Sequence, residues 1–282
     1  MSKIVSYSIF ESPDSVYAKE KGRSILQFTQ FLPLLVRAHQ VLWNGWEMWL
    51  HHDDGFTQDP YYPALVKMQH CGLVKLIRCG PSEHMCVSML WRLKPAFEVP
   101  ADCVVCRDID GIPSPLDRLA VEEWWQSGRG IHVVHHAGAH AGIMGGTFGV
   151  RPSQFKSLLY HATWDEFLER GRRAKITFDK HGDDQHLLNQ HWPSLVSDML
   201  LHELHHDTGD LPAKDIRRVV SGGDAHVFRW PAAVDFGLPQ DTIDKADSLS
   251  PGIGICSDPA PALAFYDGLN SDQLRQIRDC EK

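Results

Sequence analysis

Two carboxylates one residue apart follow a short apolar run in the first half of the chain. Asp108 and Asp110 come directly after Cys103–Cys106, whose composition predicts a buried strand. Side chains two apart on a strand point the same way, so both carboxylates would face one site. Such an oxygen-rich pair suits a hard cation such as Mg²⁺ or Mn²⁺. Arg107 adds a planar fork suited to phosphate, and the motif therefore predicts a site for a pyrophosphate-bearing ligand.

A solvated turn is the alternative for the same residues, because Asp-x-Asp triplets are frequent by chance. The surrounding residues favour the functional interpretation. The apolar strand precedes the pair, and the turn-forming residues Gly111–Pro115 follow it, so the carboxylates fall at a strand end.

A second polar set occurs at 181–189. Gly182, Asp183 and Asp184 are typical of a turn followed by a helix start, where an aspartate is favourable for stability alone. The functional interpretation places Asp184 and Gln185 at the mouth of the site, where they would hold sugar hydroxyls. Both interpretations stay open at this point.

A rival motif lies further along the chain. His202, Glu203 and His206 match H-E-x-x-H, and on a helix the two histidines would share a face and bind zinc, with Glu203 as general base. This predicts a zinc metalloprotease. However, the chain has 17 histidines, which makes chance matches common, and a protease leaves Asp108 and Asp184 without a role.

Composition limits the class of protein. The 282 residues are 43% hydrophobic and 23% charged, an ordinary globular balance. The net charge of -8 argues against a general electrostatic grip on nucleic acid, although the basic stretch 170–175 leaves a local patch open.

The cysteines and the lack of long apolar segments bear on location. The seven cysteines are irregularly spaced, which predicts reduced thiols, and Cys103 and Cys106 are expected to be buried thiols and not zinc ligands. No apolar run reaches the length of a membrane span, and Met1–Phe10 is typical of a first strand and not of a signal peptide. We expect a cytoplasmic protein, in the host cytoplasm if it is viral, with no membrane partner and no obligate protein partner.

Strands alternating with helices must position these motifs. Strands are expected at 3–10, 46–51, 73–78, 103–106 and 131–134. Helices are expected at 24–39, 63–69, 82–94, 116–127, 153–160, 164–170, 184–190 and 193–205. The glycine-rich 142–150 predicts backbone passing close to a ligand. The pattern indicates an α/β fold with a mostly parallel sheet, whose ligands bind outside the carboxyl ends of the strands.

Three of these motifs together resemble the GT-A class of nucleotide-sugar glycosyltransferases. They are the strand ending in Arg107–Asp110, the glycine-rich Gly145–Gly149, and the Asp-Gln-His-Leu-Leu-Asn of Asp184–Asn189. The last is similar to the Asp-Gln-Asp-x-Leu-Asn segment of retaining galactosyltransferase-type enzymes, with His186 replacing the second aspartate. The likeness extends over residues 3–205. Over this range the sequence is also similar to bacterial and viral glycosyltransferases of the same type.

The resemblance implies a GT-A-like, Rossmann-related α/β/α sandwich with a mostly parallel central sheet. One domain would cover 1–282. Within it, 1–115 would be the nucleotide-sugar-binding half, 116–220 the acceptor and catalytic half, and 221–282 an irregular C-terminal segment that packs on them.

The resemblance also implies the reaction, a hexosyl or pentosyl transfer from a nucleotide-diphosphate sugar, expected to be a UDP-sugar. Mn²⁺ or Mg²⁺ would be held by Asp108, Asp110 and a late histidine, His202 first, with His205 or His206 in reserve. A cation there would act as a Lewis acid on the departing nucleotide. The acceptor would be a saccharide, or a hydroxymethylated pyrimidine in phage DNA.

The remaining donor and catalytic residues follow from the same resemblance. The side chains or backbone expected at the donor are those of Tyr7, Ser8, Arg23, Arg92, Arg107, Gly145 and Gly146. A solvated surface is the alternative for the arginines at 23 and 92, and a plain turn for the glycines. Asp184 and Gln185 favour a retaining enzyme, whereas an inverting one would use Asp183 or Asp184 as general base, and both courses stay open.

Overall fold

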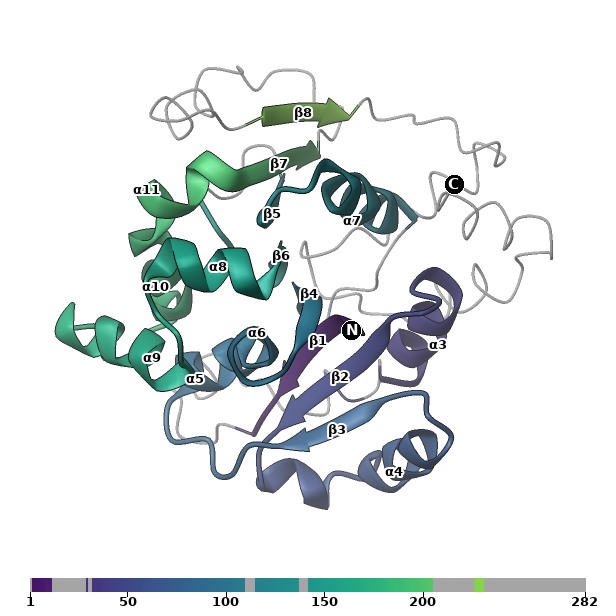
Figure 1. Cartoon of the computed structure of the whole chain (residues 1–282). Helices are drawn as coiled ribbons and strands as arrows, with labels where there is room; N and C mark the ends of the chain where they lie inside the picture. Colours follow the sequence, from purple (N-terminus) through teal and green to yellow (C-terminus); the bar gives the residue numbers. More distant parts are fainter. Residues whose placement is uncertain are drawn as a thin grey trace, which may run out of the picture.

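Buried side chains alternate between two cores along the central strands. Ile4 of β1 (Ser2–Ile9) belongs to one buried cluster and Val5 to the other, and Val104 and Val105 of β4 (Ala101–Arg107) divide in the same way. A sheet buried on both faces is typical of parallel strands covered by helices. The computed structural model, which describes residues 2–11, 29, 32–109, 115–136, 142–204 and 226–230, accordingly has three α/β/α layers (Figure 1).

One sheet joins all the described strands. Its eight strands lie in the order β3-β2-β1-β4-β6-β5-β7-β8. The other strands are β2 (Glu47–His52), β3 (Lys75–Arg78), β5 (Ile131–His136), β6 (Thr147–Val150), β7 (Met199–Leu204) and β8 (His226–Trp230). Among these strands, β6 alone runs antiparallel to its neighbours, which are β4 and β5. The predicted α/β class with a mostly parallel sheet is confirmed, and one continuous sheet crosses the predicted boundary at residue 115.

Helices cover both faces. Apolar residues of α3 (Leu32–Leu42), α4 (Tyr62–His70) and α7 (Pro115–Ser127) pack on one face. The other face is covered by α5 (Met85–Leu90), α6 (Pro95–Glu98), α8 (Pro152–Leu159), α9 (Trp164–Arg173), α10 (Asp183–Gln190) and α11 (Trp192–Leu195). The helix predicted over 24–39 is described from Leu32 and continues to Leu42, whereas 24–28, 30 and 31 lie outside the described residues.

The helix predicted over 82–94 is interrupted. The helix α5 ends at Leu90, a 3-10 turn covers Trp91–Leu93, and Pro95 begins α6. Proline has no N–H to donate and its ring disfavours the preceding helical turn, so the chain restarts there. The break matters because it places Arg92 in the turn and not within a regular helix.

The helix predicted over 193–205 is wrong. The helix α11 ends at Leu195, and Met199–Leu204 is the strand β7, which pairs in parallel with β5 and β8. A short apolar run does not distinguish a buried strand from a helix, and pairing on both sides decides for the strand. The strand β8 likewise lies within 221–282, which was expected to be irregular.

The structure also bears on the predictions for the cysteines and for membrane-spanning segments. Cys103 and Cys106 are buried in β4, and burial raises the pKa of each thiol to about 12, as expected of core cysteines. None of the helices in the described ranges combines the length and the apolar character that a membrane crossing requires.

Candidate functional site

The candidate site lies where the central parallel strands end. Asp108 directly follows the last residue of β4, and the neighbouring strand β1 ends at the same edge at Ile9. Ligands in open α/β sheets bind at this edge. The antiparallel strand β6 begins here, with Thr147 opposite Arg107, so the glycine-rich segment before it arrives beside Asp108.

Three charged side chains meet at this edge. The Arg92 guanidinium forms an ion pair with Asp108, and its Nη2 lies 3.9 Å from Oδ2 of Asp184. Arg92 and Asp184 are buried, with side chains 6% and 4% exposed, whereas the Asp108 side chain is 31% exposed. The cluster therefore presents Asp108 to solvent and keeps the other two behind it. We call these three residues the carboxylate cluster.

Two glycines allow the backbone to lie against the carboxylate cluster. A Cβ at Gly146 would overlap the carboxylate of Asp108. A Cβ at Gly145 would lie 2.6 Å from Nη2 of Arg92 and 2.9 Å from Oδ2 of Asp184. Only glycine fits both positions without movement of these charged groups. The plain-turn alternative is thus insufficient, and the close approach is to the cluster's own side chains.

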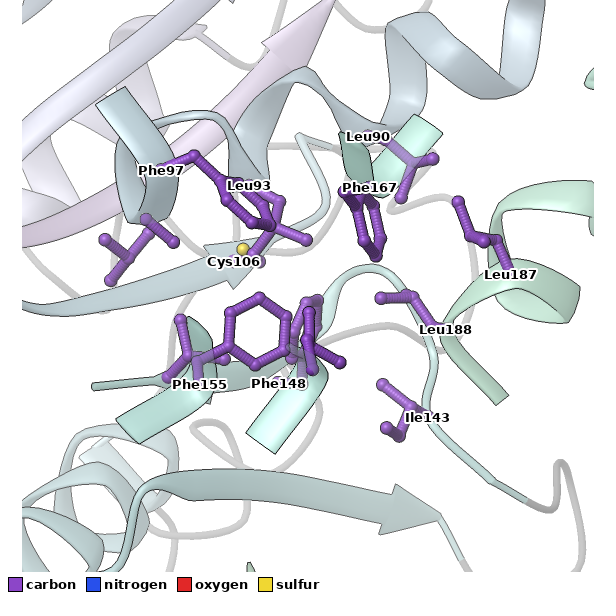
Figure 2. Packing of buried hydrophobic residues seen from close by; sticks show 14 of the residues in the cluster. Leu90, Leu93, Phe97, Cys106, Ile143, Phe148, Phe155, Phe167, Leu187 and Leu188 are labelled. Carbon is purple, nitrogen blue, oxygen red and sulfur yellow. The ribbon is translucent and has the colours of Figure 1, made fainter. Parts of the chain in front are cut away.

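The helix α10 holds Asp184 in place. It starts after Gly182, whose φ of 92° is in the left-handed region that favours glycine. Leu187 and Leu188 anchor the helix in the core beside Ile143 (Figure 2). Asp184, in the first turn, consequently has a fixed position at the sheet edge.

Asn189 ties α10 to the glycine-rich segment. Its Oδ1 accepts from the backbone N–H of Ile143 at 2.8 Å, and its Nδ2 donates to the carbonyl of Ile143 at 3.0 Å. The same Nδ2 donates to the carbonyl of Gln185 at 2.7 Å. Asn189 was part of the recognised motif but was not expected at the site. An asparagine side chain carries both a hydrogen-bond donor and an acceptor. This residue type is the sequence signal that could have indicated a link between α10 and another segment.

The carboxylate cluster carries an excess of negative charge. Burial raises the pKa of Asp184, the Arg92 guanidinium opposes the shift, and the charge of Asp108 adds to it. Two carboxylates share one guanidinium, so the ionised cluster has a net charge of about -1. A hard divalent cation would compensate this charge with oxygen ligands, so these residues fit Mn²⁺ or Mg²⁺.

The rest of the expected metal set is not assembled. Within the described parts of the chain, no three His, Cys, Asp or Glu side chains gather as a metal site. Asp110, the second carboxylate of the motif, lies outside the described residues. Its predicted part in holding the cation stays a prediction.

Arg107 does not face the site, and its predicted contact with phosphate is wrong. Its side chain is 2% exposed, and Nε and Nη2 donate to the carboxylate of Asp117 on α7 at 3.0 and 2.6 Å. Adjacent residues of a strand point to opposite faces, so Arg107 and Asp108 cannot both reach one ligand. Arg107 instead joins β4 to α7.

Tyr7 and Ser8 are also buried within the protein. Tyr7 is 0% exposed in the core under α3 and α7, where burial raises its pKa. The Ser8 hydroxyl is buried and donates to the carbonyl of Met89 at 3.1 Å. Neither side chain is open to a donor base, and a contact through the backbone of these residues stays a prediction. Arg23 lies outside the described residues.

His202 lies on the opposite face of the sheet from the carboxylate cluster. It is 0% exposed, its Nδ1 is 3.0 Å from Nε2 of His132, and its Nε2 is 3.2 Å from the Glu123 carboxylate on α7. Arg92 and Asp184 belong to elements on the other face. The prediction that His202 binds the same cation as Asp108 is therefore wrong.

The protease motif loses its geometric basis as well. His202 and Glu203 lie on the strand β7, where the helical spacing of H-E-x-x-H does not apply. His205 and His206 lie outside the described residues. The protease alternative is not favoured.

Asp183 and Gln185 flank Asp184 on the first turn of α10. Asp183 Oδ2 accepts from Oγ1 of Thr177 at 3.2 Å and from the N–H of Lys180 at 3.3 Å, which shapes the loop before the helix. Gln185 is half-buried. The catalytic roles predicted for both stay predictions.

Comparisons with known proteins give distant structural likenesses. No family model and no curated protein matches the sequence. Residues 1–349 of S. aureus TarS align at 9% identity with a TM-score of 0.42, over 71% of this chain and 57% of that one, which is less than two thirds of its length. TarS in complex with UDP aligns at 10% identity and a TM-score of 0.40, over 100% and 90%.

A third structure, a putative nucleotide-diphospho-sugar transferase from Desulfovibrio desulfuricans G20, aligns at 15% identity with a TM-score of 0.34, over 62% of this chain and 78% of that one.

Proposed function

We propose that this chain is a glycosyltransferase that moves a sugar from a nucleotide-diphosphate sugar, a UDP-sugar, to an acceptor hydroxyl. One observation carries the proposal. At the carboxyl edge of a mostly parallel sheet, Asp108 is presented beside Arg92 and Asp184, and a glycine backbone is packed directly on them. This edge is where α/β sheets bind nucleotides, and an exposed carboxylate is the ligand type that a diphosphate-bound cation needs.

Asp108, together with Asp110, would hold Mn²⁺ or Mg²⁺. The cation when bound would neutralise charge on the diphosphate of the leaving nucleotide. The excess negative charge of the carboxylate cluster favours such binding. Arg92 would keep the Asp108 carboxylate in a fixed orientation through their ion pair. The Asp108 side chain would then lose little conformational entropy when the cation binds.

Asp184 would interact with a hydroxyl of the substrates. Its carboxylate lies next to the same guanidinium, and burial raises its pKa toward the range of a general base. In an inverting transfer Asp184 would take the proton of the acceptor hydroxyl. In a retaining transfer it would accept a hydrogen bond from a donor hydroxyl, with Gln185 near the anomeric carbon. The anomeric configuration of the product, measured by NMR, distinguishes these two roles.

For the acceptor we propose a saccharide in preference to DNA. The net charge of -8 disfavours a long polyanion, because a protein gains affinity for DNA chiefly by neutralising phosphates. Transfer to DNA that contains hydroxymethylcytosine is the competing outcome, and the same labelled donor measures it.

The test is donor turnover by the purified chain. UDP-glucose, UDP-galactose, UDP-N-acetylglucosamine and GDP-mannose are each incubated with and without Mn²⁺, and release of the nucleoside diphosphate is followed. We expect metal-dependent release from a UDP-sugar. Asp108→Asn should lower it on the order of 100-fold or more, since cation stabilisation of developing charge is worth several kcal/mol.

Asp102→Asn is the matched control. Asp102 lies on the same strand as Asp108 but near its other end, so the same chemical change there should leave turnover unchanged. Full activity in Asp108→Asn would contradict the metal assignment. No turnover of any of the four donors, with no stabilisation of the fold by them, would contradict the glycosyltransferase.

A further inference from the structure

A polar pocket lies apart from the carboxylate cluster. Its volume is about 840 Å³, and this open pocket is bordered by the end of α8, by α9 and by the end of α10. This is within the size range of small-molecule sites. Its walls include Tyr160, His161, Asp165, Arg170 and Gln190. We propose that this pocket binds an oligosaccharide.

Tyr160 provides the first argument. Tyr160 is one of the residues that line the pocket and is 90% exposed. It ends α8 with a φ of 56°, in the left-handed region, where glycine or asparagine is usual and a tyrosine is strained. An aromatic ring held in water at such a position gains nothing from the core. A flat ring of this kind can pack on the apolar face of a sugar.

The hydrogen-bonding groups of the wall provide the second argument. Arg170 forms no ion pair within the described ranges, whereas the nearby Glu169 is paired with Arg172 and Arg173 at 3.6 and 3.3 Å. The guanidinium of Arg170 and the amide of Gln190, both residues of the wall, offer donors and an acceptor of the kind that sugar hydroxyls require.

Charge balance provides the third argument, because it separates a saccharide from a nucleic acid. The wall contains three carboxylates and three guanidinium groups, those of Asp165, Glu166, Glu169, Arg170, Arg172 and Arg173. The basic stretch seen in the sequence is thus balanced by acidic residues of the same helix. A balanced surface has little attraction for a polyanion but can bind a neutral polyhydroxy ligand.

The pocket is connected with the carboxylate cluster through one helix. Asp184 is near the start of α10 and Gln190 is its last residue. Six residues of helix span about 9 Å along the axis. The role of the pocket as the place that holds a saccharide acceptor rests on the proposed function, but oligosaccharide binding itself does not.

The test is direct binding, measured without any donor. Maltotriose, chitotriose, mannotriose and a galactotriose are titrated into the full chain and followed by NMR chemical shifts. We expect at least one of them to bind. Tyr160→Asn should weaken its Kd about tenfold, since the ring is lost while asparagine still tolerates the left-handed backbone. Tyr160→Phe keeps the ring and should bind like the unchanged chain.

Tyr61→Asn is the matched control, because Tyr61 is also an exposed aromatic, 36% exposed, but does not belong to the pocket wall. Asp184→Asn should lose donor turnover and keep trisaccharide binding, which separates the two proposals. The pocket proposal is overturned if none of the four trisaccharides binds, if Tyr160→Asn binds as well as Tyr160→Phe, or if only a single-stranded oligothymidylate binds. Donor turnover that survives such a result would leave the proposed function standing alone.

Discussion

At the scale of single residues, the carboxylate cluster depends on one buried guanidinium. Arg92 neutralises Asp108 and also faces Asp184, so its loss would leave two carboxylates close together with no cation between them. The functional interpretation of the sequence placed Asp184 at the mouth of the site, and the resemblance implied Arg92 only as a contact to the donor. The position of Arg92 between the two carboxylates could not be predicted, because it depends on the turn at Trp91–Leu93 that Pro95 follows.

Arg92→Met is therefore expected to destabilise the fold by about 3–5 kcal/mol, the usual effect of removing one partner from a buried ion pair. Chemical denaturation at pH 7 measures it. Arg78→Met is the matched control, since Arg78 pairs with Asp54 in the open, with side chains 65% and 43% exposed, and should leave stability nearly unchanged. Equal effects of the two substitutions would contradict the importance assigned to Arg92.

At the scale of elements, the site depends on how α10 meets the glycine-rich segment. The start and end of α10 were predicted to within one residue, because Gly182 and the first-turn aspartates are local signals. The strand β7 was predicted as a helix, because its identity comes from pairing with β5 and β8, which lie far away in the sequence. Local signals thus predict where Asp184 begins its helix but not what that helix packs against.

Asn189→Ala tests the connection between the two elements. The substitution removes the two hydrogen bonds to Ile143 and the one to Gln185, so we expect a loss of about 2–3 kcal/mol of stability. Donor turnover should also fall, about tenfold or more, because the glycines and Asp184 would no longer be held together. His186→Ala, an exposed change on the same helix, should affect neither. Unchanged turnover in Asn189→Ala would show that the tie does not position the site.

At the scale of the whole molecule, six histidines of the described residues are buried in the core. Burial lowers the pKa of His39 to about 4, of His51 to about 3 and of His191 to about 4. His132 and His202 are buried beneath α7, and burial lowers their pKa values too. The sequence could not separate these from metal ligands, because the residue type is the same and only the three-dimensional environment differs. These buried histidines therefore bear on the acid stability of the fold.

The direction of the pH effect follows from these shifts. A histidine with an ordinary pKa of 6.5 in the unfolded chain and about 4 in the folded one binds its proton more strongly when unfolded. Its contribution to stability is complete above pH 6.5 and is lost as the pH falls toward 4. At pH 5 each such group would cost at most about 2 kcal/mol, so His39, His51 and His191 together would remove a large part of a typical free energy of unfolding.

His39→Gln isolates one of these contributions. Nε2 of His39 lies 3.1 Å from the carbonyl of Trp46, and a glutamine amide can donate to the same oxygen without titrating. Urea denaturation at pH 7 and pH 5 should show a loss of stability on acidification that is about 2 kcal/mol smaller in His39→Gln than in the unchanged chain. His70→Gln, at an exposed position, should leave the loss unchanged. The same loss in His39→Gln as in the unchanged chain would mean that His39 already titrates normally in the folded state, and that the acid sensitivity has another source.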